Sequence, residues 1–340
     1  MGRGGWWLVR WLVGRPATTK KEGDQAQRIK REASHNEEKR PYATKERADA
    51  TIGAGARTEG MGLELRRYEG CLLGLACGDA VGTTVEFRPR GSFPPVNDMV
   101  GGGPFDLESG QWTDDTSMAL CLAVSLLERD GFDADDQMSR YVRWWREGYL
   151  SSTGECFDIG NTVSLALREY LRTGEAYSGS LDPYTAGNGS IMRLAPIPMF
   201  FGEDLEEVAH YAAESSRTTH GTEEAVDACR LFGVMIALAL RGEDKEAILL
   251  GGRDREPSIR RLAPAIAEIA DGVYRGKTRA EIRGTGYVVE SLEAALSCFW
   301  RSGSYRDAIM MAANLGDDAD TTAAVCGQIA GAYYGVEGIP

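Results

Sequence analysis

From Met61 onward, apolar residues recur at the three- and four-residue spacing of amphipathic helices, and this pattern limits the possible folds most strongly. The apolar-polar alternation typical of strands is scarce, and no glycine-rich dinucleotide-binding pattern is present. The sequence therefore predicts an all-α fold, formed by one compact domain over residues 62–340. Helices are expected at residues 62–79, 114–129, 135–147, 161–173, 205–215, 221–241, 258–275, 286–300, 304–314 and 319–334.

Residues 1–61 have a different composition and are predicted to form a disordered basic leader. They are polar after Pro16 and almost free of large apolar residues, so they cannot bury enough surface to offset the entropy of ordering. The whole chain has a net charge of -13. Residues 1–60 carry 13 Lys and Arg against 8 Asp and Glu, so the remaining residues carry a net charge of -18. A body this acidic repels phosphate backbones, so we expect no nucleic-acid partner.

The apolar run at residues 6–13 is the strongest membrane candidate in the sequence. It is interrupted by Arg10 and is much shorter than the roughly 20 apolar residues of a transmembrane helix. We therefore expect no stable membrane insertion and a cytoplasmic protein. The sequence leaves the oligomeric state open, with a monomer favoured.

Three loop-to-helix junctions place oxygen-bearing side chains beside glycine, immediately before apolar helical runs. They are Gly110-Gln-Trp-Thr-Asp-Asp-Thr116, Gly316-Asp-Asp-Ala-Asp-Thr-Thr322 and Gly187-Asn-Gly-Ser-Ile-Met-Arg193. Carboxylates clustered in this way repel one another unless a cation neutralises them. Because the chain has only three histidines and no paired cysteines, the oxygen-rich junctions favour Mg²⁺, Mn²⁺ or Ca²⁺ over zinc.

Each junction also has a purely structural interpretation. Asp and Thr at the start of a helix accept hydrogen bonds from free backbone N–H groups, so the first two junctions could be helix caps. The third suits a diphosphate, because Gly187 and Gly189 allow it close to backbone N–H groups at a helix N-terminus and Arg193 adds positive charge. Its structural alternative is a tight connection with Asn188 in a left-handed conformation.

Taken together and in order, these segments resemble the ADP-ribosylglycohydrolase family. The resemblance covers residues 65–340 and rests on Gly-Cys-Leu-Leu-Gly-Leu-Ala-Cys-Gly-Asp-Ala-Val-Gly-Thr-Thr-Val-Glu at 70–86, Trp-Thr-Asp-Asp-Thr at 112–116, Phe-Asp-Ile-Gly-Asn-Thr at 157–162, Gly-Asn-Gly-Ser-Ile-Met-Arg at 187–193, Thr-His at 219–220 and Asp-Ala-Asp-Thr at 318–321. It implies a compact orthogonal helical bundle with a binuclear metal site at helix N-termini.

The resemblance also implies roles for individual residues. Two Mg²⁺ or Mn²⁺ ions would be held by two ligand sets, Thr113, Asp114 and Asp115 in the first and Asp318, Asp320 and Thr321 in the second. Glu86 and Asp158 match catalytic positions, and the substrate-binding residues would be Gly187, Asn188, Gly189, Ser190, Met192 and His220. Without the resemblance, Glu86 would be interpreted as a solvated loop carboxylate, Asp158 as an acid near a helix start and His220 as a structural histidine.

The implied activity is metal-dependent hydrolysis of the glycosidic bond between ADP-ribose and an acceptor. The partner would be an ADP-ribosylated protein or a small ADP-ribosyl substrate, and the Phe-Asp-Ile-Gly-Asn segment favours arginine as the acceptor. The alternatives are hydrolysis of serine-linked or small-molecule derivatives, and a non-catalytic relative with a binding or structural function. Such a relative would be expected to lack metal ligands, whereas both sets are present here.

Overall fold

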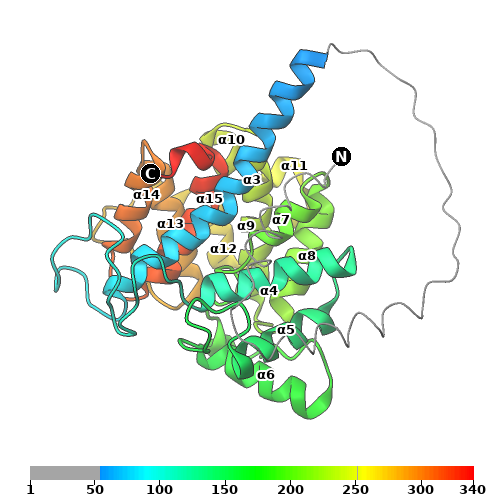
Figure 1. The fold of residues 1–340 in the computed structure, drawn as a ribbon. Helices are drawn as coiled ribbons and strands as arrows, with labels where there is room; N and C mark the ends of the chain where they lie inside the picture. Colours follow the sequence, from blue (N-terminus) through cyan, green and yellow to red (C-terminus); the bar gives the residue numbers. More distant parts are fainter. Residues whose placement is uncertain (1–53, 251) are drawn as a thin grey trace, which may run out of the picture.

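The computed structural model describes residues 54–250 and 252–340, which form helices connected by loops (Figure 1). Within these residues the only β-type pairings are three isolated bridges, so the predicted all-α fold is confirmed. The helices are α3 (Ala54–Gly82), α4 (Asp114–Arg129), α5 (Ala134–Glu147), α6 (Asn161–Thr173), α7 (Pro196–Phe201), α8 (Leu205–Arg217), α9 (Glu223–Leu240), α10 (Lys245–Leu250), α11 (Gly252–Arg255), α12 (Pro264–Ala270), α13 (Val288–Arg301), α14 (Tyr305–Ala313) and α15 (Ala319–Tyr334). Short 3-10 helices occur at Thr83–Val85, Pro183–Thr185, Pro257–Arg260, Val273–Gly276 and Val336–Gly338.

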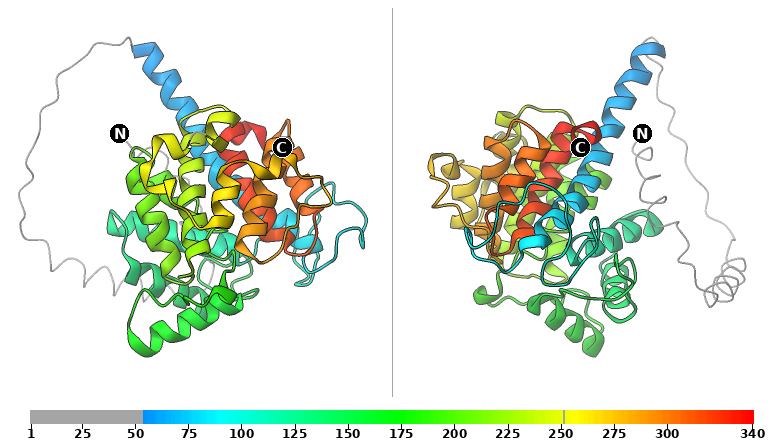
Figure 2. Two further views of the ribbon diagram at one scale, coloured as in Figure 1. Left: turned by 180° about the vertical axis from the view of Figure 1, so that it is seen from behind. Right: turned by 60° about the vertical axis from the view of Figure 1, so that its left-hand side comes forward.

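Helices α3 and α15 pack closely and antiparallel at the centre of the fold (Figures 1 and 2). Glycines at four-residue spacing on α3 make this possible, because a Cβ at any of them would lie within 2.3 Å of a backbone oxygen of α15. The four α3 residues and their α15 neighbours are Gly70 with Gly331, Gly74 with Gly327, Gly78 with Ala323 and Gly82 with Ala319. The pairing brings the C-terminal end of α3 to the N-terminal end of α15.

Helix α9 supplies much of the apolar core, and most of its residues are buried. It packs against α8, where Gly233 allows a close approach to Val208 and Ala212. Helix α4 is buried along nearly its whole length and contacts α3, α5 and α7. The C-terminal end of α3, the start of α4 and the N-terminal end of α15 therefore lie close together at one side of this core.

The helix ends follow local sequence signals. Asp133, Asp204, Thr222 and Ser304 accept hydrogen bonds from backbone N–H groups in the first turns of α5, α8, α9 and α14. Several helices end at residues with positive φ, where the left-handed conformation stops helical hydrogen bonding; examples are Gly148 after α5 and Gly174 after α6. The predicted bounds of α4, α6 and α15 agree with the structure.

Two predictions about helices were wrong, and three short helices were not predicted. The expected helix at 258–275 is divided into two 3-10 helices and α12, because Pro264 starts a new helix and Gly272 has a φ of 75°. Helix α3 starts at Ala54, inside the predicted leader, whose residues 1–53 lie outside the described part of the chain. The short helices α7, α10 and α11 were not predicted, since segments of four to six residues carry too little periodicity.

No helix in the described part of the chain is long and apolar enough to cross a membrane.

Candidate active site

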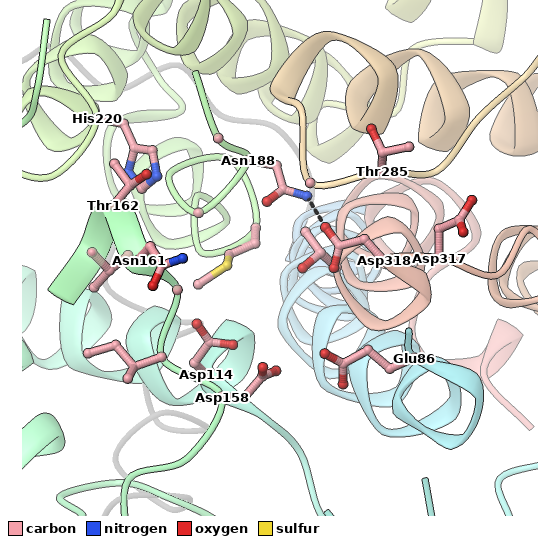
Figure 3. A pocket seen from close by; sticks show the side chains of 18 of the residues that line it. Glu86, Asp114, Asp158, Asn161, Thr162, Asn188, His220, Thr285, Asp317 and Asp318 are labelled. Atoms are coloured by element: carbon pink, nitrogen blue, oxygen red, sulfur yellow. Dashed lines mark hydrogen bonds between the residues drawn. The ribbon is translucent and has the colours of Figure 1, made fainter. Parts of the chain in front are cut away.

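The candidate site lies where the end of α3, the starts of α4 and α15 and three loops meet (Figure 3). A cavity of about 810 Å³ opens there. Glu86, Asp114, Asp158, Asp318 and Thr321 line it, and Thr113, Asp115 and Asp320 are buried next to them. All the predicted metal-ligand and catalytic residues are therefore brought together, although they come from four separate segments.

The first predicted ligand set does not cap its own helix. Thr113 is the N-cap residue of α4, but its side chain makes no capping hydrogen bond. Its Oγ1 instead lies 3.3 Å from Asp115 Oδ2 and 3.4 Å from Asp320 Oδ2. The capping interpretation of this junction is thus wrong, because the Thr113 hydroxyl donates to Asp79 and its oxygen faces the carboxylates of Asp115 and Asp320.

Asp79 performs the capping role, and sequence analysis did not single it out. This side chain, fully buried near the end of α3, accepts hydrogen bonds from the backbone N–H and hydroxyl of Thr113, at 2.9 Å each. It also accepts from the backbone N–H of Thr116 at 3.1 Å and from its hydroxyl at 2.6 Å. The available signal was a lone carboxylate inside an apolar helical run, where an unpaired charge would be costly.

The second ligand set behaves in the same way. Asp318 is the N-cap residue of α15 and makes no capping bond; its Oδ2 accepts from Asn188 Nδ2 at 2.6 Å (Figure 3). Thr321 Oγ1 lies 3.4 Å from Asp115 Oδ2, which connects the two ligand sets directly. Asp317 is exposed at the rim of the cavity.

Glu86 and Asp158 approach the ligand sets from two further loops. Glu86 is only 3 % exposed, so its interpretation as a solvated loop carboxylate is wrong. Carboxylate oxygens of Glu86, Asp158 and Asp320 all lie within 4.8 Å of one another, close enough to share a metal ion. Asp158 has a φ of 57°, a strained conformation for a residue other than glycine and one that is enriched at functional sites.

Burial and mutual repulsion raise the pKa values of the whole cluster. Burial first, and then the charge of Asp158, raise the pKa of Glu86 to about 9. Burial and then Asp318 raise the pKa of Asp158 to about 7. Burial is likewise the main cause that raises the pKa values of Asp114, Asp115, Asp318 and Asp320.

The donor set fits a hard divalent cation. Asp115 Oδ1 and Asp320 Oδ1 are buried and have no hydrogen-bond partner, which is costly unless a ligand takes that place. In the described part of the chain, no Lys or Arg forms a salt bridge with any carboxylate of the cluster. Carboxylate and hydroxyl oxygens are the ligands that Mg²⁺, Mn²⁺ and Ca²⁺ prefer.

One wall of the cavity is formed by the loop at residues 187–192. Gly187, Asn188, Gly189 and Met192 line it, as does His220 (Figure 3). Ser190 does not line the cavity. Its hydroxyl is buried in the core, where it accepts hydrogen bonds from Ser216 Oγ at 3.0 Å and Cys229 Sγ at 3.3 Å, so the structure does not place it with the other predicted substrate-binding residues.

Two further expectations for this loop were wrong. No helix begins directly after Gly189, because residues 189–193 form turns and α7 begins only at Pro196. Arg193 is fully buried and donates to Thr219 Oγ1 at 2.6 Å, with its guanidinium over the Tyr141 ring, so it does not line the cavity. The structural alternative, a tight connection with Asn188 in a left-handed conformation, also fails. Asn188 is not among the described non-glycine residues that have a positive φ.

His220 is buried but its ring borders the cavity. Its Nδ1 lies 2.8 Å from Thr219 Oγ1. Burial, and then the charge of Arg193, lower its pKa to about 3, so the imidazole is neutral near pH 7. A Cβ at Gly189 would lie 2.8 Å from His220 Cε1, so the glycine leaves room for the ring.

The sequence pattern of the ADP-ribosylglycohydrolase family matches residues 61–340. The chain belongs to this family. Among its relatives, the ADP-ribosylarginine hydrolase Tri1 of Pseudomonas putida (strain GB-1) is 51 % identical over 276 residues, which cover 81 % of this chain and 72 % of the relative. The ADP-ribosyl-[dinitrogen reductase] glycohydrolase of Rhodospirillum rubrum is 31 % identical over 281 residues, covering 81 % and 87 %.

A solved structure described as an ADP-ribosylglycohydrolase-related protein complex has a similar fold. The TM-score is 0.71 at 43 % sequence identity, and the similarity covers 82 % of this chain and 90 % of the other. The predicted family and the ADP-ribosylglycohydrolase type of helical fold are therefore confirmed.

Proposed function

We propose that the protein hydrolyses the N-glycosidic bond between ADP-ribose and the arginine side chain of an ADP-ribosylated protein. The family and the names of relatives such as the Pseudomonas putida ADP-ribosylarginine hydrolase support this reaction. The observation that carries the proposal is the convergence of Glu86, Asp158 and Asp320 on one point beside the large cavity. The cavity volume lies within the range typical of small-molecule sites.

We further propose that two Mg²⁺ or Mn²⁺ ions belong to the working enzyme. Thr113, Asp114 and Asp115 would hold one ion, and Asp318, Asp320 and Thr321 the other. The unpartnered oxygens of Asp115 and Asp320 support this assignment. Bound divalent ions would orient ribose hydroxyls and water and neutralise the charge of the cluster.

Glu86 is the candidate for proton transfer, with Asp158 as the alternative. In the reaction, a water oxygen bonds to the anomeric carbon and loses a proton, the carbon–nitrogen bond breaks, and the departing guanidine gains a proton. Such glycosidic reactions pass through an oxocarbenium-like state and benefit from a placed carboxyl group. Burial is the main cause that raises the pKa of Glu86, and burial favours the protonated form that can donate a proton.

The loop at 187–189 and His220 are proposed to bind the ADP portion of the substrate. The N–H groups of Gly187 and Asn188 already donate to the carbonyls of Thr185 and Gly286, so within the loop the Gly189 N–H would donate to a diphosphate oxygen, and the neutral His220 ring adds a flat apolar contact. The buried Arg193 has no part in this contact. Met192 completes the same wall.

The test is the release of free ADP-ribose from arginine-linked and serine-linked ADP-ribosylated peptides, with Mg²⁺, with Mn²⁺ and with EDTA. Metal-dependent release from the arginine-linked peptide is expected. Faster release from the serine-linked peptide would show that serine, and not arginine, is the preferred acceptor. No release from either peptide by folded, metal-loaded protein would contradict the proposed function.

A further inference from the structure

Three phenylalanines form an aromatic rim beside the two candidate catalytic carboxylates. The aromatic rim consists of Phe87, which follows Glu86, Phe157, which precedes Asp158, and Phe105 between them. The Phe87 and Phe105 ring centroids are 6.3 Å apart, and those of Phe105 and Phe157 are 5.1 Å apart. Phe87 also lines the cavity.

Phe87 is held in a position that folding alone does not favour. Its side chain is 65 % exposed, and its φ of 61° is a left-handed conformation that is strained for an aromatic residue. The conformation is maintained by the backbone, since Phe87 N–H donates to the Asp317 carbonyl at 2.7 Å and Asp317 N–H donates to the Arg88 carbonyl at 2.8 Å. An exposed ring that lines a cavity and has a strained backbone conformation is a candidate for contact with a ligand.

The position of the rim relative to the other cavity walls indicates which part of the substrate it contacts. His220 and Glu86 lie on opposite sides of the cavity (Figure 3). If the ADP portion lies along the His220 wall, the scissile bond lies near Glu86 and Asp158. The acceptor side chain then leaves the cavity past Phe87, which directly follows Glu86.

We propose that the aromatic rim is the acceptor subsite and that Phe87 stacks on the positively charged guanidinium of ADP-ribosylated arginine. This inference rests on the proposed function and extends it to the choice of acceptor. A guanidinium is attracted to the face of an aromatic ring, and it retains its positive charge when one nitrogen carries the ribose. A serine acceptor carries no charge and would gain little from the rim.

The experiment measures KM and kcat for an arginine-linked ADP-ribosyl peptide with wild type, Phe87→Tyr, Phe87→Leu and Phe87→Ala. Phe87→Leu retains apolar bulk but lacks an aromatic face, so it separates cation–π attraction from simple packing. We expect Leu and Ala to raise KM by about 5- to 30-fold with little change in kcat, and Tyr to stay close to wild type. Tyr177→Ala is the matched control, because this aromatic side chain is 51 % exposed and does not line the cavity.

Two binding measurements make the outcome specific to the acceptor. The dissociation constant of free ADP-ribose should be the same in all the variants, because the ADP wall is untouched. Inhibition by an arginine peptide should exceed inhibition by the same peptide with neutral citrulline, and Phe87→Leu should remove that difference. Wild-type KM in Phe87→Leu, or weaker ADP-ribose binding equal to the rise in KM, would overturn the acceptor subsite alone. A wild-type protein that releases no ADP-ribose would instead overturn the proposed function together with it.

Discussion

Two clusters of buried polar side chains lie near the cavity, and they differ in the groups that surround their charges. Around Arg193, the positive charge is met by the Thr219 hydroxyl, the Ser215 carbonyl and the Tyr141 ring. Around Asp115 and Asp320, one oxygen of each carboxylate has no protein partner. The Arg193 guanidinium is held by contacts within the protein, although its Nε has no partner, whereas the acidic cluster gathers like charges and would be completed by a bound cation.

The difference shows how a structural and a functional polar cluster can be separated without a bound ligand. A charge that is matched within the protein contributes to one fixed conformation, and its removal should reduce stability. Charges of one sign without counter-ions oppose folding, and their removal should reduce activity while the fold remains. Substitutions in the two clusters should therefore have opposite consequences.

The largest effect is expected in the acidic cluster. Asp115→Asn and Asp320→Asn should each lower kcat/KM by about 10³-fold or more, because each removes the charge of a proposed metal ligand. The free energy of unfolding of the metal-free protein at pH 8 should be unchanged or higher. ADP-ribose release and urea denaturation in EDTA provide the two measurements. Metal-dependent turnover close to that of wild type in Asp320→Asn would contradict the metal assignment.

The opposite result is expected for Arg193. Arg193→Met should lower the free energy of unfolding by about 2–4 kcal/mol, since charge-assisted hydrogen bonds and the cation–π contact are lost in the core. Protein that remains folded should still bind Mn²⁺. Urea denaturation measures the first effect and calorimetric titration the second. The matched control is Arg172→Met, because Arg172 is exposed and pairs with Glu169 at the surface. An equal loss of stability there would remove the distinction.

Asp79 shares a feature with each cluster. It accepts four hydrogen bonds within the protein, and it positions Thr113 in the acidic cluster. Asp79→Asn should reduce activity by about 10- to 100-fold and weaken Mn²⁺ binding, since the amide group would face donors that now point at a carboxylate. Asp133→Asn is the control, because Asp133 caps α5 away from the cavity. Equal effects of the two substitutions would show that Asp79 is only a helix cap.

The smallest effect concerns the pH dependence of the metal-free protein. The pKa values of Asp158 and Glu86 in the folded state, about 7 and about 9, lie above the unfolded values of about 4. The folded state therefore binds these protons more tightly, so stability should fall as pH rises from about 4 toward 9. In EDTA the melting temperature should be lower at pH 8 than at pH 6, and Mn²⁺ should raise it more at pH 8. An increase in the stability of the metal-free protein over this pH interval would contradict the conclusion that the carboxylates of the cluster lack counter-ions.

The sequence predicted the helices and the chemistry of the acidic site because both depend on local patterns. Helical periodicity depends on neighbours three and four residues apart, which explains why α4, α6 and α15 have the predicted bounds. Carboxylates and hydroxyls grouped at Thr113–Asp115 and Asp318–Thr321 likewise indicate a hard cation wherever the groups lie. The prediction at 258–275 failed because Pro264 and Gly272 interrupt an otherwise continuous apolar pattern.

Side-chain direction within a loop could not be predicted in the same way. Residues 187–193 were interpreted as one anion-binding segment, yet Gly187 and Asn188 line the cavity while Ser190 and Arg193 point into the core. Neighbouring turn residues have no fixed period, so their directions depend on what surrounds the loop. Asp79 was not singled out for the same reason, because its partners are on another helix.

The sequence by itself determined the helical class, the family and the type of ligand that the acidic residues prefer. Only the tertiary structure decided that Thr113 and Asp320, 207 residues apart in the chain, lie 3.4 Å apart in space. That approach depends on the glycine face of α3, which lets α15 pack against its backbone and brings the helix ends together. Short-range periodicity is encoded residue by residue, whereas such long-range contacts are specified by the packing of the whole core.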